Sequence, residues 1–261
     1  MPGLKHCRIA VALVLMAAGL SVVITVVPRL PPTGPAWAQV SNSPDPSRYE
    51  TRAVHDPNGT GRFYMGREIA QVMGIGGVEW LDRPDRDSVE HPSMVIDALN
   101  LRGNEVVADL GAGSGYYTFR IASRLGESGK VLAVDIQKAM LEIIRTRAEK
   151  LRITNVEEIK ADADDPHLPA GGVDGVLMVD VYHELAYPYE IMTHVRAALK
   201  PGGRVVFVEY RKEDPGVPIK EVHKMSVKQL KKEMDAVGLT HLQTIESLPW
   251  QHIVIFAAPQ S

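Results

Sequence analysis

Residues 106–115 read VVADLGAGSG, a short β-branched run that ends in an acidic residue and continues into three glycines at alternate positions. This pattern predicts a buried strand and a turn in which a ligand lies against bare backbone, because glycine lacks a Cβ and tolerates positive φ. Gly111, Gly113 and Gly115 depart from the G-x-G-x-x-G spacing of a dinucleotide site, since position 116 is Tyr. Asp109 before them suits a ligand with a positive amino or sulfonium group.

Strands and helices alternate from residue 105 onward, which is typical of a parallel sheet with helical crossovers. The expected strands are 105–110, 130–135, 156–160, 173–179, 204–209, 240–246 and 252–257. Residues 247–251 leave no room for a crossover helix, so the last two strands should form an antiparallel hairpin. The sequence therefore predicts an α/β fold with a seven-stranded, mostly parallel sheet and a terminal antiparallel hairpin. The helices expected between the strands would cover both faces of this sheet.

Residues 49–104 precede the sheet and are expected to form an N-terminal helical cap, with the main domain over 105–261. Residues 62–72 are predicted as a short helix that the following glycines stop, and Pro92 favours a second helix over about 93–99. Residues 39–48 are polar and proline-rich, which predicts a disordered linker.

Residues 1–38 have the features of a targeting segment. Lys5 and Arg8 precede an uncharged, largely apolar stretch, 9–27, and the sequence AWA at 36–38 fits the small-x-small rule of signal peptidase. A cleaved signal peptide is the first expectation, and an uncleaved anchor is the alternative, because the apolar stretch is just long enough to span a bilayer. Both place the folded part outside the cytoplasm, in the periplasm or on the inner membrane facing it.

The composition argues against several kinds of site. The 261 residues carry a net charge of −3 with no basic bias, so nucleic acid is not an expected partner. Cys7 is the single cysteine, which excludes an intrachain disulfide and a cysteine metal site. Seven histidines show no metal-ligand spacing, so no metal is predicted; they are His6, His55, His91, His167, His194, His241 and His252.

The glycine motif, the succession of β/α units and the final hairpin together resemble the class I S-adenosylmethionine (SAM) methyltransferases, over about 93–258. The sequences YMGRE (64–68) and YHEL (182–185) also resemble a group of exported bacterial methyltransferases. The resemblance implies a Rossmann-like fold, SAM as cofactor and transfer of a methyl group. Because nothing resembles the Asn-Pro-Pro-Tyr motif of relatives that methylate nucleic acids and protein amides, a small-molecule acceptor is expected.

The expected cofactor residues follow the carboxyl ends of strands, where ligands bind in open α/β sheets. Gly111, Gly113 and Gly115 would bring backbone against the methionine part of SAM. Asp109 would face the SAM amino group, or would only brace the turn.

The second and third strands are followed by the residues expected around the nucleoside. Asp135 would accept hydrogen bonds from the ribose hydroxyls, with Ile136 packing on adenine; the alternative is a solvated residue at a helix start. The resemblance assigns the adenine amino group to Asp162 and the adenine ring to the N–H of Ala163. Asp164 and Asp165 lie close enough to permit another register.

The fourth strand ends in VDVYHE, residues 179–184, where the family places residues that face the acceptor. Asp180 would hold the methionine part or the acceptor, and His183 is the candidate general base, since its ordinary pKa near 6.5 suits proton removal. Tyr182 would pack against the sulfonium methyl, as aromatic faces do with cations. In the alternative, His183 and Glu184 only open the next helix and Tyr182 packs in the core.

Other residues and two other functions stay open. Tyr116 and Tyr117 would line the pocket or pack in the core, and Arg211, Lys220 and His223 are candidates for contact with the acceptor. A SAM-binding protein without turnover would need nothing reactive after the fourth strand, which the YHE sequence argues against. A nicotinamide-dependent oxidoreductase is disfavoured by the glycine spacing and the final hairpin.

Overall fold

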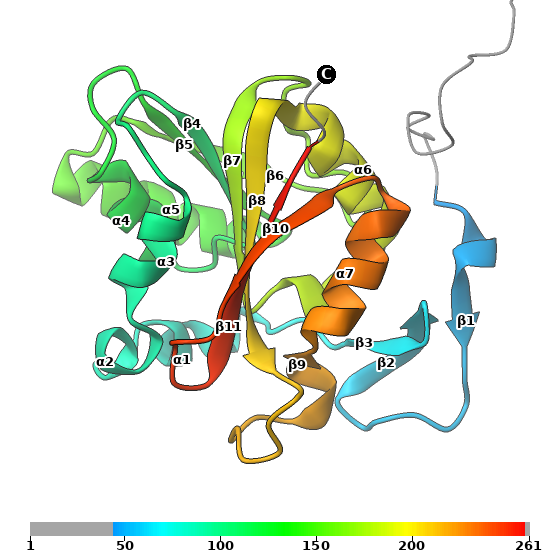
Figure 1. Ribbon diagram of the computed structural model, residues 1–261. Coiled ribbons are helices and arrows are strands. Elements are labelled where there is room, and N and C mark those ends of the chain that lie inside the picture. Colours follow the sequence, from blue (N-terminus) through cyan, green and yellow to red (C-terminus); the bar gives the residue numbers. More distant parts are fainter. Residues whose placement is uncertain (1–43, 259–261) are drawn as a thin grey trace, which may run out of the picture. The chain divides into compact units, whose positions relative to one another are not determined.

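The fold is described over residues 44–258 in a computed structural model of the chain (Figure 1). Its central sheet contains β4 (Val106–Leu110), β5 (Lys130–Asp135), β6 (Val156–Lys160), β7 (Val173–Val179), β8 (Leu199–Arg211), β9 (Lys224–Met225), β10 (Thr240–Ile245) and β11 (Gln251–Ala257). The strand order is β10-β11-β8-β7-β4-β5-β6, with the two-residue β9 paired to β8. The predicted α/β fold is confirmed, and β9 is one strand more than the seven expected.

The directions of the strands also match the prediction. Strands β4 to β8 pair in parallel, whereas β11 pairs antiparallel with both β8 and β10. The loop between β10 and β11 is too short for a crossover, so the chain turns straight back on itself.

Helices cover both faces of the sheet because its strands are apolar on both sides. The long helices are α3 (Pro92–Ala98), α4 (Tyr116–Ala122), α5 (Lys138–Leu151), α6 (Pro188–Ala198) and α7 (Val227–Ala236). Ala108 and Leu110 of β4 pack in the core beneath α6 and α7, whereas Val107 points to the opposite face, beneath α3 and α4. Figure 1 shows these helices on the two sides of the sheet.

The region expected as a helical cap contains a second, antiparallel sheet in the order β1-β2-β3, made of β1 (Tyr49–Thr51), β2 (Gly59–Tyr64) and β3 (Arg67–Ala70). The helix predicted over residues 62–72 is therefore wrong. Met65 and Gly66 take φ of 49° and 95° and join β2 to β3 as a two-residue hairpin turn, a backbone path that no helix can follow. Short helices α1 (Val78–Leu81) and α2 (Arg86–Glu90) come next.

The second half of the predicted linker is also ordered. Residues 46–48 form a 3-10 helix capped by Asp45, and the Asp45 N–H donates to Glu190 Oε1 of α6 (3.2 Å). The predictions for residues 1–38 and 39–43 lie outside the described residues. Within residues 44–258, no helix has the length and apolar character needed to cross a membrane.

A buried ion pair joins the β2–β3 hairpin to helix α7. Arg67 donates to both carboxylate oxygens of Glu233 on α7, at 2.8 and 2.9 Å, and also donates to the backbone carbonyl of His183 (3.3 Å). The Glu233 carboxylate also accepts from the Tyr182 hydroxyl (2.6 Å). The hairpin thereby positions the segment that follows β7.

Candidate functional site

A cavity lies at the carboxyl ends of β4, β5 and β7, and its wall includes the glycine loop, Asp135, Asp180 and His183. The chain builds β4, β5 and β6 in one direction and then places β7 on the other side of β4. The cavity therefore opens where the strand order reverses, which is where open α/β sheets bind their ligands.

The glycine loop presents backbone to the cavity because side chains do not fit there. Gly111, Gly113 and Gly115 have φ of 78°, 53° and 87°, in the left-handed region. A Cβ on Gly111 would lie 2.3 Å from Val181 Cγ2, and one on Gly115 would lie 2.7 Å from Phe119. All three glycines are thus required by conformation, and Gly111 and Gly115 also by space, which fits a ligand that lies against the backbone.

Asp135 connects the end of β5 to the glycine loop. One carboxylate oxygen accepts the Gly113 N–H (2.9 Å) and the other accepts the Gln137 N–H (2.7 Å). The residue is 6% exposed, so it is not the solvated residue of the alternative prediction. Burial raises the pKa of its carboxyl group above the ordinary value. Both oxygens keep lone pairs for further donors, and Ile136 beside it also lines the cavity.

Asp109 lines the cavity and also braces the turn, and its contact with the SAM amino group stays a prediction. Its carboxylate accepts a hydrogen bond from the Thr118 hydroxyl of α4 (2.6 Å). Burial raises the pKa of Asp109 from 3.8 to about 6, although the Thr118 bond opposes the shift. A cation placed beside this carboxylate would favour its charged form.

We expect Asp109→Asn to change the pH dependence of stability. Because the pKa is raised in the folded state, the contribution of Asp109 to stability is fully present below 3.8 and is lost as the pH rises through about 6. At about 1.4 kcal/mol per pKa unit, the loss is about 2 kcal/mol between pH 4.5 and 7.5. Urea denaturation at both pH values should show Asp109→Asn gaining that amount relative to wild type. The same difference at both pH values would contradict the assignment.

Asp162 and Ala163 both lie on the cavity wall, after β6. Asp164 and Asp165 are not among the described residues that line it, which favours the predicted register. The Asp162 N–H donates to the Asp165 carbonyl (2.8 Å), which folds the loop, and His167 Nε2 lies 2.9 Å from the exposed Asp162 carboxylate.

Asp180 follows β7 with φ of 52°, a left-handed conformation that Asp tolerates better than most residues. One carboxylate oxygen accepts from Gln251 Nε2 (2.6 Å), and the other has no hydrogen-bond partner within residues 44–258. Burial, with the carboxylates of Glu90 and Glu209 nearby, raises the pKa of Asp180 well above its ordinary value. Asp180 therefore lines the cavity with a carboxylate that hydrogen bonds satisfy only in part, and its oxygen without a partner is itself buried.

The structure contradicts the prediction that Tyr182 contacts the cofactor. Tyr182 is fully buried, and it is not among the described residues that line the cavity. Its ring packs edge-on against Phe207 in the core (5.1 Å between centroids), and its hydroxyl donates a hydrogen bond to Glu233 of α7. These two contacts hold the Tyr182 side chain in the core.

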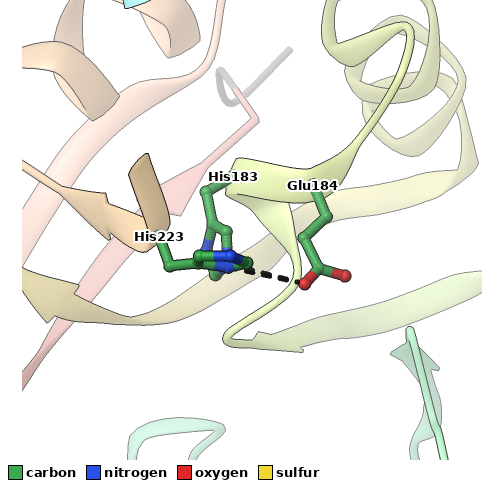
Figure 2. A group of neighbouring side chains, drawn as sticks. All are labelled: His183, Glu184 and His223. Atoms are coloured by element: carbon green, nitrogen blue, oxygen red, sulfur yellow. Dashed lines mark hydrogen bonds and ion pairs between the residues drawn. The ribbon is translucent and has the colours of Figure 1, made fainter. Parts of the chain in front are cut away.

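Three polar side chains meet at the cavity wall beyond β7. His183 and Glu184 lie in a 3-10 helix (Tyr182–Glu184), and His223 ends another (Glu221–His223). Figure 2 shows the three side chains turned toward one another. The distance between His183 Nε2 and His223 Nδ1 is 3.0 Å, and Glu184 Oε1 lies 3.8 and 3.7 Å from these two nitrogens.

A buried carboxylate orients this cluster. Glu209, on β8, is fully buried and accepts hydrogen bonds from His183 Nδ1–H (2.6 Å) and from the Tyr182 N–H (2.9 Å). Burial is the largest single effect on His183 and opposes its protonation, but the charge and the hydrogen bond of Glu209, together with the charge of Glu184, raise the pKa of His183 above its ordinary value. Burial and the neighbouring His183 lower the pKa of His223 to about 4, and burial raises that of Glu184 to about 7.

Sequence reasoning missed several residues of the site. Glu209 ends the apolar strand predicted over 204–209, and an acidic residue at that place is itself a signal, because burial of a charge needs a partner. Arg86 and Glu90, a buried pair at 2.9 Å on α2, lay in the region expected only as a cap. Tyr116 and Tyr117 do line the cavity, whereas Arg211 instead donates to Glu246 (2.9 Å) and to loop carbonyls.

Comparisons with known proteins agree with this geometry. A family described as methyltransferase domain matches residues 101–256. The chain is 31% identical over 157 residues to the ubiquinone/menaquinone biosynthesis C-methyltransferase UbiE of Escherichia fergusonii, which is 59% of this chain and 57% of that protein. It is 33% identical over 161 residues to a 37.1 kDa transposon protein of Streptomyces fradiae, covering 57% of this chain and 46% of the other.

A solved structure shares the fold. The SAM-dependent methyltransferase from Aquifex aeolicus superimposes with a TM-score of 0.68 at 24% identity, covering 72% of this chain and 100% of that one. The chain belongs to the methyltransferase domain family, in the class I SAM-dependent group, whose cofactor is SAM. The chain spans about half the length of the curated relatives that it matches.

Proposed function

We propose that this protein transfers a methyl group from SAM to a small-molecule acceptor bound in the cavity. The observation that carries the proposal is the composition of one continuous wall. The glycine loop and Asp135, proposed as the cofactor end, line the same cavity as the polar cluster of His183, Glu184 and His223, proposed as the acceptor end. A cofactor and an acceptor held there would meet inside a single cavity.

The cofactor end would be formed by residues after three neighbouring strands. The glycine loop would contact the methionine part, Asp109 its amino group and Asp135 the ribose hydroxyls, while Asp162, Ala163 and Ile136 would surround adenine. Asp180, which lines the cavity, would hold the methionine part or the acceptor. Bound SAM supplies a methyl group already activated by a sulfonium, so the chain's task is mainly to bind and orient.

The acceptor end has apolar walls beside the polar cluster. Val72, Met73 and Trp80 line the cavity and come from the segment between the hairpin and α2. Two hydrogen bonds hold this segment at the cavity wall: the Met73 N–H donates to Glu184 Oε2 (3.2 Å), and Gln137 Nε2 donates to the Met73 carbonyl (2.9 Å). Such walls suit a compact, partly apolar molecule that carries an ionisable O–H, N–H or S–H group. The similarity to UbiE, a methyltransferase of ubiquinone and menaquinone biosynthesis, is a second support for a small-molecule acceptor.

The transfer itself needs little covalent participation by the protein. The bond from the methyl carbon to sulfur breaks as the bond to the acceptor atom forms. Sulfur keeps the electron pair, and the acceptor's proton leaves to water. The residues at the acceptor end would orient the acceptor and favour its deprotonated form.

Binding and turnover test the proposal separately. Titration calorimetry of the purified chain should show saturable binding of SAM and of its demethylated product, each with one site. Mass spectrometry should then find a product heavier by one methyl group in a panel of phenols, thiols and amines incubated with SAM. Absence of binding of both nucleosides would refute the proposal.

We also propose that the folded part acts outside the cytoplasm. The support is the sequence of residues 1–38, in which two basic residues are followed by an apolar stretch and then by AWA. Intact mass in periplasmic and membrane fractions of an expressing bacterium distinguishes cleavage after residue 38 from an anchor. Recovery of the full-length chain in the cytoplasm alone would contradict export.

A further inference from the structure

We propose that His183, Glu184 and His223 bind a divalent transition-metal ion at the acceptor end of the cavity. The cluster offers two imidazole nitrogens and one carboxylate oxygen, all within 4.8 Å of one another. Ligands about 2.0–2.2 Å from one ion lie roughly 3–3.6 Å apart. The distance of 3.0 Å between the two imidazole nitrogens already lies in this range, and the two distances of 3.7 and 3.8 Å to Glu184 need to close by only about a few tenths of an ångström.

The hydrogen bonds around the cluster leave the ligand atoms free for an ion. His183 donates its Nδ1–H to the buried Glu209, so the lone pair of its Nε2 faces Glu184 and His223. A carboxylate behind the histidine is the usual support of a metal-ligating imidazole, because it fixes the tautomer and raises the basicity of the ligand. Glu184 is held in the same way, with Oε2 accepting from the Met73 N–H and Oε1 left toward the histidines.

The three polar side chains of the cluster are largely buried, which costs free energy unless a cation or a proton pairs with them. The side chains of His183 and Glu184 are 2% and 8% exposed, and that of His223 is 19% exposed. Two ring nitrogens that face each other at 3.0 Å repel unless a proton or a cation lies between them.

The ligand set indicates the kind of ion. Two imidazoles and one carboxylate suit Zn²⁺, Fe²⁺ or Co²⁺, whereas Mg²⁺ and Ca²⁺ prefer oxygen ligands. Three protein ligands leave coordination positions open, as in catalytic rather than structural sites. These positions face the cavity, since all three residues line it. The part of the inference that concerns the reaction rests on the proposed function: the ion would hold the acceptor's reacting group and lower its pKa. In that arrangement His183 is a ligand and not a free base.

Metal titrations test the site without any turnover. Chelator-treated full chain is titrated with Co²⁺, followed by its visible ligand-field absorption, and with Zn²⁺ in competition; Mg²⁺ is the negative probe. We expect one site per chain that prefers Zn²⁺ and Co²⁺ to Mg²⁺. Glu184→Gln, which preserves shape, and His223→Ala should each weaken binding by at least about tenfold. The matched control is His241→Ala on β10, where Nε2 lies 2.9 Å from the Thr244 hydroxyl.

SAM calorimetry on the same samples separates this inference from the proposed function. Metal binding without SAM binding would refute the methyltransferase proposal and leave the metal site standing. SAM binding with Co²⁺ and Zn²⁺ affinities that are equal in wild type, Glu184→Gln and His223→Ala would overturn the metal site, and a shared proton would then join the two histidines.

Discussion

Asp135→Ala should weaken SAM binding by roughly 5- to 150-fold, and this is the largest effect that we expect on ligand affinity. The range corresponds to a loss of about 1–3 kcal/mol, the usual contribution of hydrogen bonds to a charged acceptor. The substitution removes the carboxylate proposed for the ribose and also releases the Gly113 and Gln137 N–H groups. The glycine loop should therefore lose a hydrogen bond that fixes its position, and it should become less ordered.

Calorimetry on folded protein measures this effect, with Asp174→Ala as the matched control. Asp174 is also an acidic residue of the sheet that accepts a backbone N–H, from Val106 (2.8 Å), but it is not among the described residues that line the cavity. Asp174→Ala should keep SAM affinity within about twofold, while it loses the stability contributed by the Val106 hydrogen bond and by the half-exposed ion pair with Lys200 (2.6 Å). Unchanged affinity in folded Asp135→Ala would remove Asp135 from the cofactor site.

Arg67→Met should destabilise the fold by about 3–5 kcal/mol, the largest stability effect that we expect. The Glu233 side chain is completely inaccessible to solvent, and Arg67 is the cation that pairs with it at 2.8 Å. Removing one partner of a buried pair leaves an uncompensated charge, which costs far more than the pair contributes. The hydroxyl of Tyr182 and the amide of Gln229 also donate to Glu233, but neither of them neutralises its charge.

Urea denaturation provides the measurement, and a second substitution tests its cause. Arg67→Met combined with Glu233→Met replaces both charges with apolar side chains of similar length, so it should recover at least about 1 kcal/mol of the loss. The control is Arg124→Met, which breaks an exposed pair with Asp97 (3.3 Å) and should cost under about 1 kcal/mol. A single variant as stable as this control would show that the buried pair is not needed.

The parts of the fold that sequence predicts well are those fixed by local chemistry. Residues 106–115 form β4 and the glycine loop as expected, because an apolar β-branched run and positive-φ glycines leave the chain few other conformations. Ser226 accepts from the Gln229 N–H (3.1 Å) and caps α7 as its spacing predicts. The five residues between the last two strands likewise permit only a hairpin.

The errors arise where the pattern fits two structures or where distant residues combine. Phe63 and Tyr64, and likewise Ile69 and Ala70, are consecutive buried residues of β2 and β3, so these segments lack the apolar–polar alternation that marks a strand in the sequence. Leu151 fits the spacing of the buried face of α5 but is 58% exposed, because the helix ends there and Arg152 turns left-handed. The His183–Glu184–His223 cluster could not be read from spacing, since His223 follows His183 by 40 residues and only the fold joins them.

The link through Arg67 has a consequence for the history of this chain. The matched family region begins at residue 101, yet a guanidinium from outside it neutralises the carboxylate of α7 and supports the carbonyl of His183. Positions 67 and 233 should therefore change together, because loss of the arginine alone leaves the Glu233 charge buried and unpaired. An N-terminal segment taken from a relative should support this domain only where its residue at position 67 suits the residue at position 233.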